Sequence, residues 1–544
     1  MKATLKKMSC FIGLTVSLAG CGVSGTVSNE TAIDQLSVSL NEEWQEDQTE
    51  KEKKYQSLLN SGEYDEDNMY IKLDPYGASP LSALLLFQTD EAMKAEISVA
   101  GKDENTTIKN NFEDYTTEHS LPVLGLYADT ENEVTVTLTD EAGNSVEKTV
   151  AIKTGMLPDS IAKIDVKEAD TSKMDLGDSE LTFVVPSTKR AYAFDANGDV
   201  RWYSTRYNSH IFKELSNGNL LYLTKESNDA DTYNVLLETD YVGKIYKRYD
   251  FSSSSAANDT GKSEGEMTVI HHDGIELPNG NLLLTVNVGS NYIEDTMIEL
   301  NRETGEIEKT IDLKDVLPEA FYEDYDSTSR EDGKIDWFHQ NSVEYDEADN
   351  SIIISGRHQD TIMKIDYDTS EIKWIMGDSD GWPQSYQKYF LASDIKASGG
   401  QHAAIVLPDQ DDNADTTDIL YYDNNISVTR GDEATSEKYS EARQVRIDEK
   451  EMTIEEVWTF GEELGKAYYT KIIGSARYLN STGNRLVNFG YRDEGQTSSI
   501  LEVTEEGETV FDADLTDFPT SAWAYRAERL SLYNGKWAYQ LDYE

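Results

Sequence analysis

The chain repeats one β-hairpin pattern along most of its length, and this repeat limits the folds that it can adopt. An apolar run, a turn rich in Asn, Gly or Asp, and a second apolar run occur together in segments that begin at His210, His272, His339, His402, Arg477 and Glu528. Apolar runs joined by such turns are typical of β-hairpins. The segments follow one another at intervals of roughly 50–75 residues, and a hairpin unit repeated in this way indicates a propeller or an array.

A second hairpin pattern alternates with the first. Its copies begin near Ala191, Leu236, Met297, Ile362, Val445 and Ile500. The series therefore starts with a lone hairpin of the second kind and ends with a lone hairpin of the first kind. We predict an all-β fold: a six-bladed β-propeller with four strands per blade, closed by its N- and C-terminal hairpins, because closure protects the sheet edges. In the closing blade, the segment after Glu528 supplies two strands and the segment from Lys189 to Tyr203 supplies the other two.

This organisation places a set of histidines at one end of the propeller. His210, His272, His339 and His402 stand at the start of the first strand in four successive units. If that strand lines the central channel, the four side chains meet at one mouth. Arg357 follows the second strand of the third unit, and an antiparallel strand ends where its partner begins. We therefore expect Arg357 on the same rim as His339.

Two kinds of ligand suit such a cluster. Imidazoles bind zinc, but the sequence shows no HxH or HxxxH arrangement with a carboxylate, and Arg357 opposes a cation. Three imidazoles and a guanidinium suit an oxyanion better, since a planar guanidinium can donate two hydrogen bonds to one anion. Neutral imidazole is also a nucleophile toward a sulfuryl or phosphoryl centre. We predict an anion site that needs no metal and no cofactor.

The net charge restricts the partners of the protein. The 544-residue chain has 48 Lys and Arg against 103 Asp and Glu, which gives a net charge of −55. So acidic a surface argues against nucleic acid and against anionic membrane surfaces as partners. It also repels an anionic substrate, so an anion site must supply its own positive groups.

The N-terminus has the pattern of an export signal. Lys2, Lys6 and Lys7 precede a short apolar run that is too short to span a bilayer. Leu18-Ala19-Gly20-Cys21 resembles a bacterial lipobox. Residues 1–21 are therefore predicted to be a lipoprotein signal peptide and lipobox, with Cys21 lipidated. This places the protein outside the cell, anchored to the outer face of the cytoplasmic membrane, or on the periplasmic side where there are two membranes.

Two further segments precede the propeller. Residues 22–65 are predicted to be a tether, rich in Ser, Thr and Gly up to residue 40, followed by a charged helical stretch over 41–60. Residues 66–155 contain alternating apolar runs and are predicted to form a small N-terminal β-sandwich. The propeller then occupies residues 156–544.

At the histidine segments the chain resembles the bacterial aryl-sulfate sulfotransferases that act without the nucleotide donor PAPS. The stretch from Asp336 that reads DWFHQNSVEYDEADNSIIISGRH is similar to the signature block of that family. The stretch GQHAAIVLPD from Gly400, followed by YDNN from Tyr422, resembles the block that carries the nucleophilic histidine. DPYGASPLSAL from Asp74 and LPVLGLYADTENEV from Leu121 resemble the N-terminal domain of the family.

The resemblance implies an activity and a set of roles. The family transfers a sulfuryl group from an aryl sulfate ester to a phenolic acceptor, with ping-pong kinetics and a sulfohistidine intermediate. His402 would be the nucleophile, and His339 and Arg357 would hold the sulfuryl oxygens. Either His271 or His272 would complete the site, since two alignments of the repeat disagree. The resemblance also suggests a homodimer. Periplasmic members of the family can carry a disulfide near the site. This chain cannot form one there, because its only cysteines are Cys10 and Cys21.

Two alternatives come from other function classes. The first is a non-catalytic propeller lipoprotein that binds an anion or a glycan. The second is an aryl sulfate hydrolase that uses water as the acceptor. An assay with and without a phenol separates these two alternatives from the sulfotransferase. The transferase needs the phenol to turn over, the hydrolase does not, and the binding protein does not turn over at all.

Overall fold

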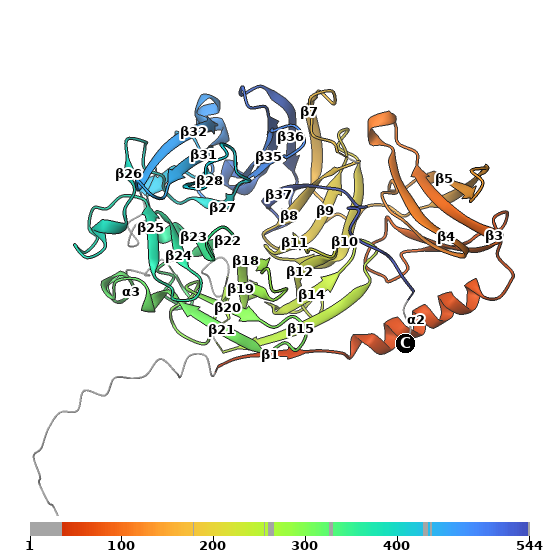
Figure 1. Cartoon of the computed structure of the whole chain (residues 1–544), viewed down its shortest axis with the longest axis horizontal. Helices are drawn as coiled ribbons and strands as arrows, with labels where there is room; N and C mark the ends of the chain where they lie inside the picture. Colours follow the sequence, from red (N-terminus) through yellow and green to blue (C-terminus); the bar gives the residue numbers. More distant parts are fainter. Residues whose placement is uncertain are drawn as a thin grey trace, which may run out of the picture.

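Most of the protein is built from antiparallel β-sheets. The computed structural model describes residues 35–177, 179–254, 256–258, 266–325, 330–427, 434–435 and 438–541. Within them, a ring of sheets surrounds a common centre, and a second β-domain is attached to one side of the ring (Figure 1). The mostly-β, propeller-like architecture expected from the hairpin repeat is confirmed.

Six sheets of four antiparallel strands form the ring in the described part of the chain. Their innermost strands are β11 (Phe212–Glu214), β18 (Ile270–Glu276), β22 (Gln340–Asp346), β27 (His402–Val406), β33 (Ser475–Tyr478) and β37 (Ala524–Leu530). The second strands are β12 (Leu220–Thr224), β19 (Leu282–Val286), β23 (Ser351–Gly356), β28 (Thr416–Asp423), β34 (Arg485–Arg492) and β8 (Leu181–Pro186). The third are β14 (Val235–Thr239), β20 (Thr296–Leu300), β24 (Thr361–Asp366), β31 (Glu441–Asp448), β35 (Thr497–Val503) and β9 (Lys189–Phe194). The outer are β15 (Ile245–Ser253), β21 (Ile307–Asp312), β25 (Ile372–Met376), β32 (Thr453–Phe460), β36 (Thr509–Thr516) and β10 (Val200–Asn208).

The apolar character of the central strands follows from burial on both faces. All six residues of β23, which read SIIISG, are buried, because this sheet packs between its two neighbours in the ring. β-Branched side chains fit such a pleated, two-sided surface well. The tight turns depend on glycines with positive φ, such as Gly218 at +82° and Gly280 at +84°, a conformation that costs glycine little. The Asn-Gly signal in the sequence therefore marks real hairpins.

The closing sheet differs from the prediction. β37 from the C-terminus pairs with β8, and β9 and β10 complete the sheet. The ring is thus closed by one C-terminal strand and three N-terminal strands, where the sequence analysis expected two of each. The hairpin expected after Glu528 is wrong. β37 ends at Leu530, and the chain then runs on without strand structure to residue 541, because it contacts the N-terminal domain instead.

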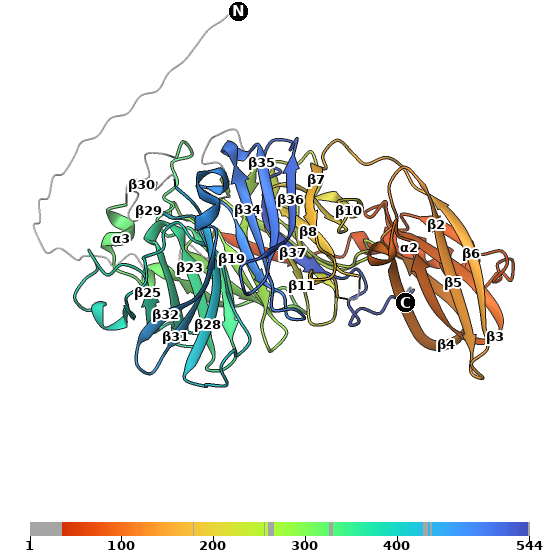
Figure 2. The same ribbon diagram turned by 90° about the horizontal axis from the view of Figure 1, so that it is seen from above.

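The N-terminal domain is one connected sheet with a helix packed on it (Figure 2). Its strands are β2 (Tyr70–Leu73), β3 (Ala83–Val99), β4 (Ile108–Val123), β5 (Glu131–Asp140) and β6 (Ser145–Lys153). Helix α2 (Trp44–Leu59) buries Tyr55 and Leu59 against Leu84 and Leu86 of β3, so the helix expected in this segment is confirmed. Arg201 of β10 is fully buried and ties the two domains together, since it donates hydrogen bonds to the carbonyl oxygens of Gly125 and Thr106.

Three segments add a fifth strand to sheets of the ring in the described part of the chain. β1 (Leu36–Leu40) pairs with β15, β7 (Lys163–Ala169) pairs with β36, and the two-residue β26 (Ala392–Ser393) pairs in parallel with β32. The expectation of a tether up to residue 40 is therefore wrong for 36–40, because Leu36 is buried in the core between two sheets. Shorter elements are α3 (Ala320–Glu323), β13 (Thr232–Tyr233), β16 (Ala257–Asn258), β17 (Met267–Thr268), β29 (Ile426–Ser427) and β30 (Ala434–Thr435).

The predicted signal peptide and Cys21 lie outside the described residues. Among the residues that are described, no helix has both the length and the apolar character needed to cross a membrane.

Candidate active site

The histidines expected at the inner strands lie together. His210 precedes β11, His272 lies near the start of β18, His339 directly precedes β22, and His402 is the first residue of β27. The ring centroids of His210 and His272 are 5.0 Å apart, and those of His272 and His339 are 4.7 Å apart. His358 joins the group at 4.6 Å from His339. The expectation that these strand starts meet at one end of the ring is confirmed.

The backbone at these histidines is unusual. His210, His272 and His339 have φ angles of 55°, 34° and 54°, a left-handed region that costs a non-glycine residue about 1–2 kcal/mol. In the fourth unit the left-handed residue is Ala403, at 55°. The same backbone strain occurs at three matching strand starts. Such strain persists only where surrounding contacts enforce it, and it is often found at functional sites.

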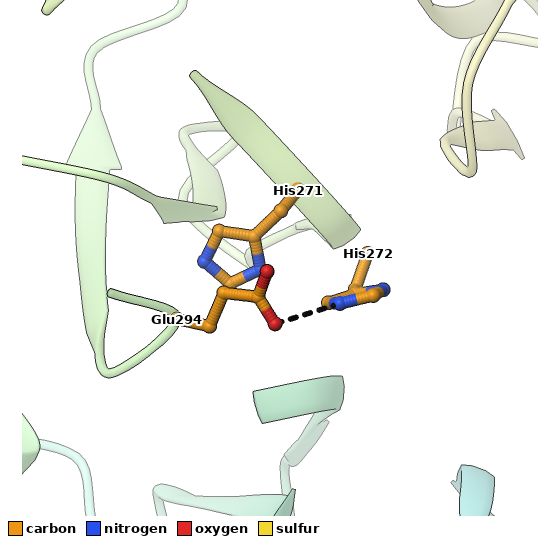
Figure 3. Close-up of side chains that lie close together, drawn as sticks. All are labelled: His271, His272 and Glu294. Atoms are coloured by element: carbon orange, nitrogen blue, oxygen red, sulfur yellow. Dashed lines mark hydrogen bonds and ion pairs between the residues drawn. The ribbon is translucent and has the colours of Figure 1, made fainter. Parts of the chain in front are cut away.

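The structure distinguishes His271 from His272. His272 shares the left-handed conformation of His210 and His339, and its ring faces that of His339. A β-bulge between Ile270 and Gly274 interrupts the strand alternation, so both adjacent rings lie near Glu294 (Figure 3). His271 is 1% exposed, and in the described part of the chain neither of its ring nitrogens has a hydrogen-bond partner. His272 therefore corresponds to the other channel histidines, and His271 lies behind it.

Hydrogen bonds fix the tautomer of His402. Its Nδ1 lies 2.7 Å from Oδ1 of Asn424 and 2.9 Å from the carbonyl oxygen of Gly400. The amide nitrogen of Asn424 donates to the carbonyl oxygens of Thr470 and Ile473, so its oxygen must face His402. Two acceptors at Nδ1 require a proton there. The lone pair of a neutral His402 is therefore on Nε2.

The electrostatic surroundings keep His402 neutral. Burial lowers its pKa well below the usual value, and the positive charges of Arg357 and His339 lower it further. The start of β27 is held against the neighbouring sheet, which carries His339. Nδ2 of Asn341 in that sheet donates to the carbonyl oxygen of Gln401, next to His402, at 2.7 Å. A neutral imidazole with a free Nε2 is the form that can act as a nucleophile.

Arg357 supplies a buried positive charge on the same rim. It follows β23, is 6% exposed, and donates from Nη1 to Nε2 of His358 at 2.7 Å. Its Nη2 reaches the carbonyl oxygen of Lys471 at 3.4 Å, whereas its Nε is buried without a partner among the described residues. A guanidinium with an unused buried donor suits a bound anion. The placement of Arg357 beside His339 agrees with the sequence analysis.

Substitution of Arg357 by lysine should strongly impair turnover. Lysine keeps the charge but loses the planar donor pair, and one lost donor to a developing oxyanion lowers the rate by about 10²–10³-fold. Steady-state kcat/KM with an aryl sulfate and a phenol measures the effect. The variant should melt within a few degrees of the parent, and a parent-like kcat/KM would show that Arg357 is peripheral.

Two carboxylates that the sequence analysis missed lie inside the cluster. Asp336 Oδ2 is 2.6 Å from Nδ1 of His339, and Glu294 Oε2 is 2.7 Å from the same nitrogen. The sequence holds no HxH or HxxxH motif with a carboxylate, yet the fold brings two carboxylates to His339 from outside such motifs. Asp336 stands three residues before His339 and could have been found by its spacing. Glu294 lies in the loop before β20, and no spacing signal connects it to the histidines.

These carboxylates change the charge of His339. Burial alone would lower its pKa, but the negative charges of Asp336 and Glu294, and their hydrogen bonds, outweigh burial and raise the pKa to about 9. His339 is therefore a cation at neutral pH. Together with Arg357 it supplies the local positive charge that an anion site in so acidic a protein requires.

Two groups in the cluster have donor sets that could also hold a metal ion. They are His271, His272 and Glu294 (Figure 3), and Asp336, His339 and His358. Arg330 lies 3.6 Å from Oδ2 of Asp336, and Arg357 donates to His358. These guanidinium groups oppose a cation in the second group. The absence of a metal or cofactor remains a prediction.

Comparison with known proteins is consistent with this site. Residues 165–526, more than half of the chain, match the family model described as Arylsulfotransferase (ASST). Residues 70–155 match the model described as Arylsulfotransferase Ig-like domain. The first match contains every histidine of the cluster, and the second covers the N-terminal β-domain.

Curated relatives match over most of their length. The chain is 24% identical over 520 residues to the arylsulfate sulfotransferase AssT of Escherichia coli O6:H1 (strain CFT073), covering 77% of this chain and 84% of that protein. It is 22% identical over 512 residues to AssT of Lelliottia amnigena, covering 75% and 82%. Among solved structures, the β-propeller domain of Cps50 (Swd1) from Myceliophteria thermophila is 10% identical, with a TM-score of 0.33 and coverage of 66% and 87%. A TM-score this low decides nothing about the fold, which rests on the sheets themselves.

Proposed function

The chain belongs to the arylsulfotransferase (ASST) family, and from this premise we propose that it transfers a sulfuryl group from an aryl sulfate ester to a phenol through a covalent intermediate on His402. The observation that carries the proposal is the fixed tautomer of His402. Its Nδ1 proton is bound by Asn424 and Gly400, and its Nε2 lone pair is left for chemistry. The acidic surface argues for a substrate of low charge, such as a monoanionic aryl sulfate.

In the first half-reaction, Nε2 of His402 attacks sulfur and the bond between sulfur and the aryl oxygen breaks. Arg357 and cationic His339 stabilise the negative charge on the sulfuryl and aryl oxygens. The departing phenolate takes the Nε2 proton of His339 and leaves as a phenol. A group with a pKa of about 9 is well matched to a phenol, whose pKa is about 10.

The second half-reaction reverses these steps with a new phenol. The acceptor hydroxyl returns its proton to His339, its oxygen attacks sulfur, and the bond from sulfur to Nε2 breaks. One site serves both halves, so ping-pong kinetics follow. Because sulfuryl transfer resembles phosphoryl transfer in its loose transition state, positioning and charge stabilisation supply most of the catalysis.

The location and assembly of the protein are part of the proposal. The lipobox-like sequence at Cys21 supports export and anchoring by a lipid on the outer face of a bacterial membrane. The six sheets are proposed to act as the blades of one closed propeller, and the family suggests a homodimer. The natural donor and acceptor are taken to be an aryl sulfate and a phenol.

A single assay tests the function. The purified protein is mixed with a chromogenic aryl sulfate, with and without a phenol acceptor. The proposal expects rapid phenol release only when the acceptor is present, formation of the sulfated acceptor, and parallel double-reciprocal plots. Equal release without acceptor would indicate an aryl sulfate hydrolase. Binding of the ester without any release would indicate an anion-binding propeller.

A further inference from the structure

Glu294 joins two of the histidines in the cluster and touches no reacting atom in the steps above. We propose that Glu294 is a positioning residue: its carboxylate holds His272 and His339 together and fixes which of their nitrogens carry protons. The catalytic meaning of this role rests on the proposed function, whereas the hydrogen-bond role does not. Glu294 is 4% exposed, so its charge acts in an environment where water screens it little.

One carboxylate oxygen makes both contacts. Oε2 of Glu294 lies 3.0 Å from Nε2 of His272 and 2.7 Å from Nδ1 of His339. These histidines belong to neighbouring sheets, so Glu294 connects the two strand starts across the gap between sheets. Figure 3 shows its side chain reaching His272 from the loop before β20, with the ring of His271 beside it. An acid that is shared by two imidazoles restricts the rotation of both.

The backbone holds Glu294 in a strained conformation. Its φ is 58°, a left-handed value that a non-glycine residue keeps only when its surroundings enforce it. Its N–H donates to Oδ1 of Asn287 at 3.0 Å, and its carbonyl oxygen accepts from the N–H of Gln340 at 2.9 Å. Gln340 directly follows His339, so Glu294 and His339 are fixed to each other through the main chain as well as the side chains.

The contacts of Glu294 fix the proton positions on both histidines. Nδ1 of His339 faces the carboxylates of Glu294 and Asp336 and must carry a proton, which leaves Nε2 of His339 to exchange protons with a phenol. Nδ1 of His272 lies 3.0 Å from the hydroxyl of Tyr525. An ionised carboxylate can only accept, so Nε2 of His272 carries a proton and donates it to Glu294. Burial lowers the pKa of His272, so its Nδ1 is unprotonated and accepts from the hydroxyl of Tyr525, whose own pKa burial raises.

Several charged or titratable groups surround His339, and Glu294 is one of the two nearest. Asp336 contacts the same nitrogen, and the pKa of His402 responds to His339. These groups are Asp336, Glu294, His271, His272, His358, His402, Arg330 and Arg357. Because Asp336 and Glu294 are the main groups that raise the pKa of His339 toward 9, removing the charge of Glu294 should lower that pKa while His339 remains hydrogen-bonded to Asp336.

The test follows His339 directly in the full chain. The chain has seven histidines, so 13C labelling at Cε1 gives a small set of NMR signals, and His339→Gln assigns the one of interest. In the parent, His339 should titrate near pH 9. In Glu294→Gln, the proton affinity of His339 should fall at least 10-fold, which is one pH unit. Glu303→Gln, at a solvent-exposed acid of the next turn, is the matched control and should leave the titration unchanged.

Activity gives a second readout. The alkaline limb of the kcat/KM profile should move to lower pH in Glu294→Gln by the same amount as the NMR titration, and Glu294→Asp, which keeps the charge, should move it less. If the parent shows no sulfuryl transfer, the proposed function fails while the NMR experiment still judges Glu294. An unchanged His339 titration in a folded Glu294→Gln variant would overturn the proposal. So would a stoichiometric metal ion in the purified parent that is lost in this variant, because Glu294 would then be a ligand.

Discussion

Replacing His402 with alanine should abolish sulfuryl transfer and leave the fold intact. Nδ1–H of His402 donates to Oδ1 of Asn424 and to the carbonyl oxygen of Gly400, which leaves the lone pair of the imidazole on Nε2. Loss of a covalent nucleophile lowers kcat by a factor on the order of 10⁴–10⁶. Turnover of a chromogenic aryl sulfate with a phenol acceptor measures this loss.

Mass spectrometry separates this explanation from a general disruption of the site. The parent, mixed with donor alone and quenched, should carry a sulfuryl adduct on the peptide that contains His402, and the variant should carry none. Arg357→Lys serves as a comparison, since it should slow adduct formation but leave the adduct on His402. Two results would contradict the assignment of His402 as the nucleophile. One is an adduct on another histidine in folded His402→Ala, and the other is turnover by that variant within ten-fold of the parent.

The hairpin series was predictable because its signals are local. An Asn-Gly turn and the apolar runs beside it are set by a few neighbouring residues, and the inner hairpins beginning at His210, His272, His339 and His402 all form in the structure. The position of Arg357 beside His339 follows from antiparallel pairing alone, since the segment from Gln340 to Gly356 is one hairpin. Local patterns of this kind therefore located four histidines and the arginine of the candidate site.

The acids of the site could not be found in the same way. The chain has 103 Asp and Glu, so a single glutamate in a loop carries no signal. Glu294 reaches the cluster because its loop crosses to the next sheet and binds the N–H of Gln340. Tyr525 comes from the opposite end of the chain, 253 residues after His272. Contacts that depend on how sheets pack against each other are set by the whole fold, and no spacing rule reports them.

The closing sheet was mispredicted for a similar reason. β8 is a buried run followed by only Ser187 and Thr188 before β9, so it lacks the glycine turn that marks the other hairpins. The segment after Leu530 contains Asn534-Gly535, which resembles a hairpin turn. In the structure Tyr533 instead hydrogen-bonds to the backbone of Pro122 and Leu124 in the N-terminal domain. A turn signal describes a local bend and does not say which partner the chain then meets.

Deleting residues 524–544 should prevent stable folding of the ring. The deletion removes β37, the innermost strand of the closing sheet, and exposes the edge of β8. It also removes Arg526, 2.8 Å from Asp273, and Arg529, 2.9 Å from Glu502, all of them buried. Breaking one buried pair costs about 3–5 kcal/mol, so two such losses approach the total stability of a typical domain, about 5–15 kcal/mol. Size-exclusion chromatography and thermal melting should show aggregation or a large loss in Tm.

A shorter deletion tests whether the strand itself is responsible. Removing only residues 531–544 keeps β37, Tyr525 and both buried ion pairs, but loses the contacts of Tyr533 with the N-terminal domain. Because the ring stays closed and the histidine cluster stays complete, this variant should remain soluble, melt at a lower temperature than the parent, and keep a measurable part of its sulfuryl transfer. If both deletions behave alike, the contacts with the N-terminal domain stabilise the protein more than closure by β37 does. If the longer deletion melts like the full chain, closure by β37 is not what holds the ring together.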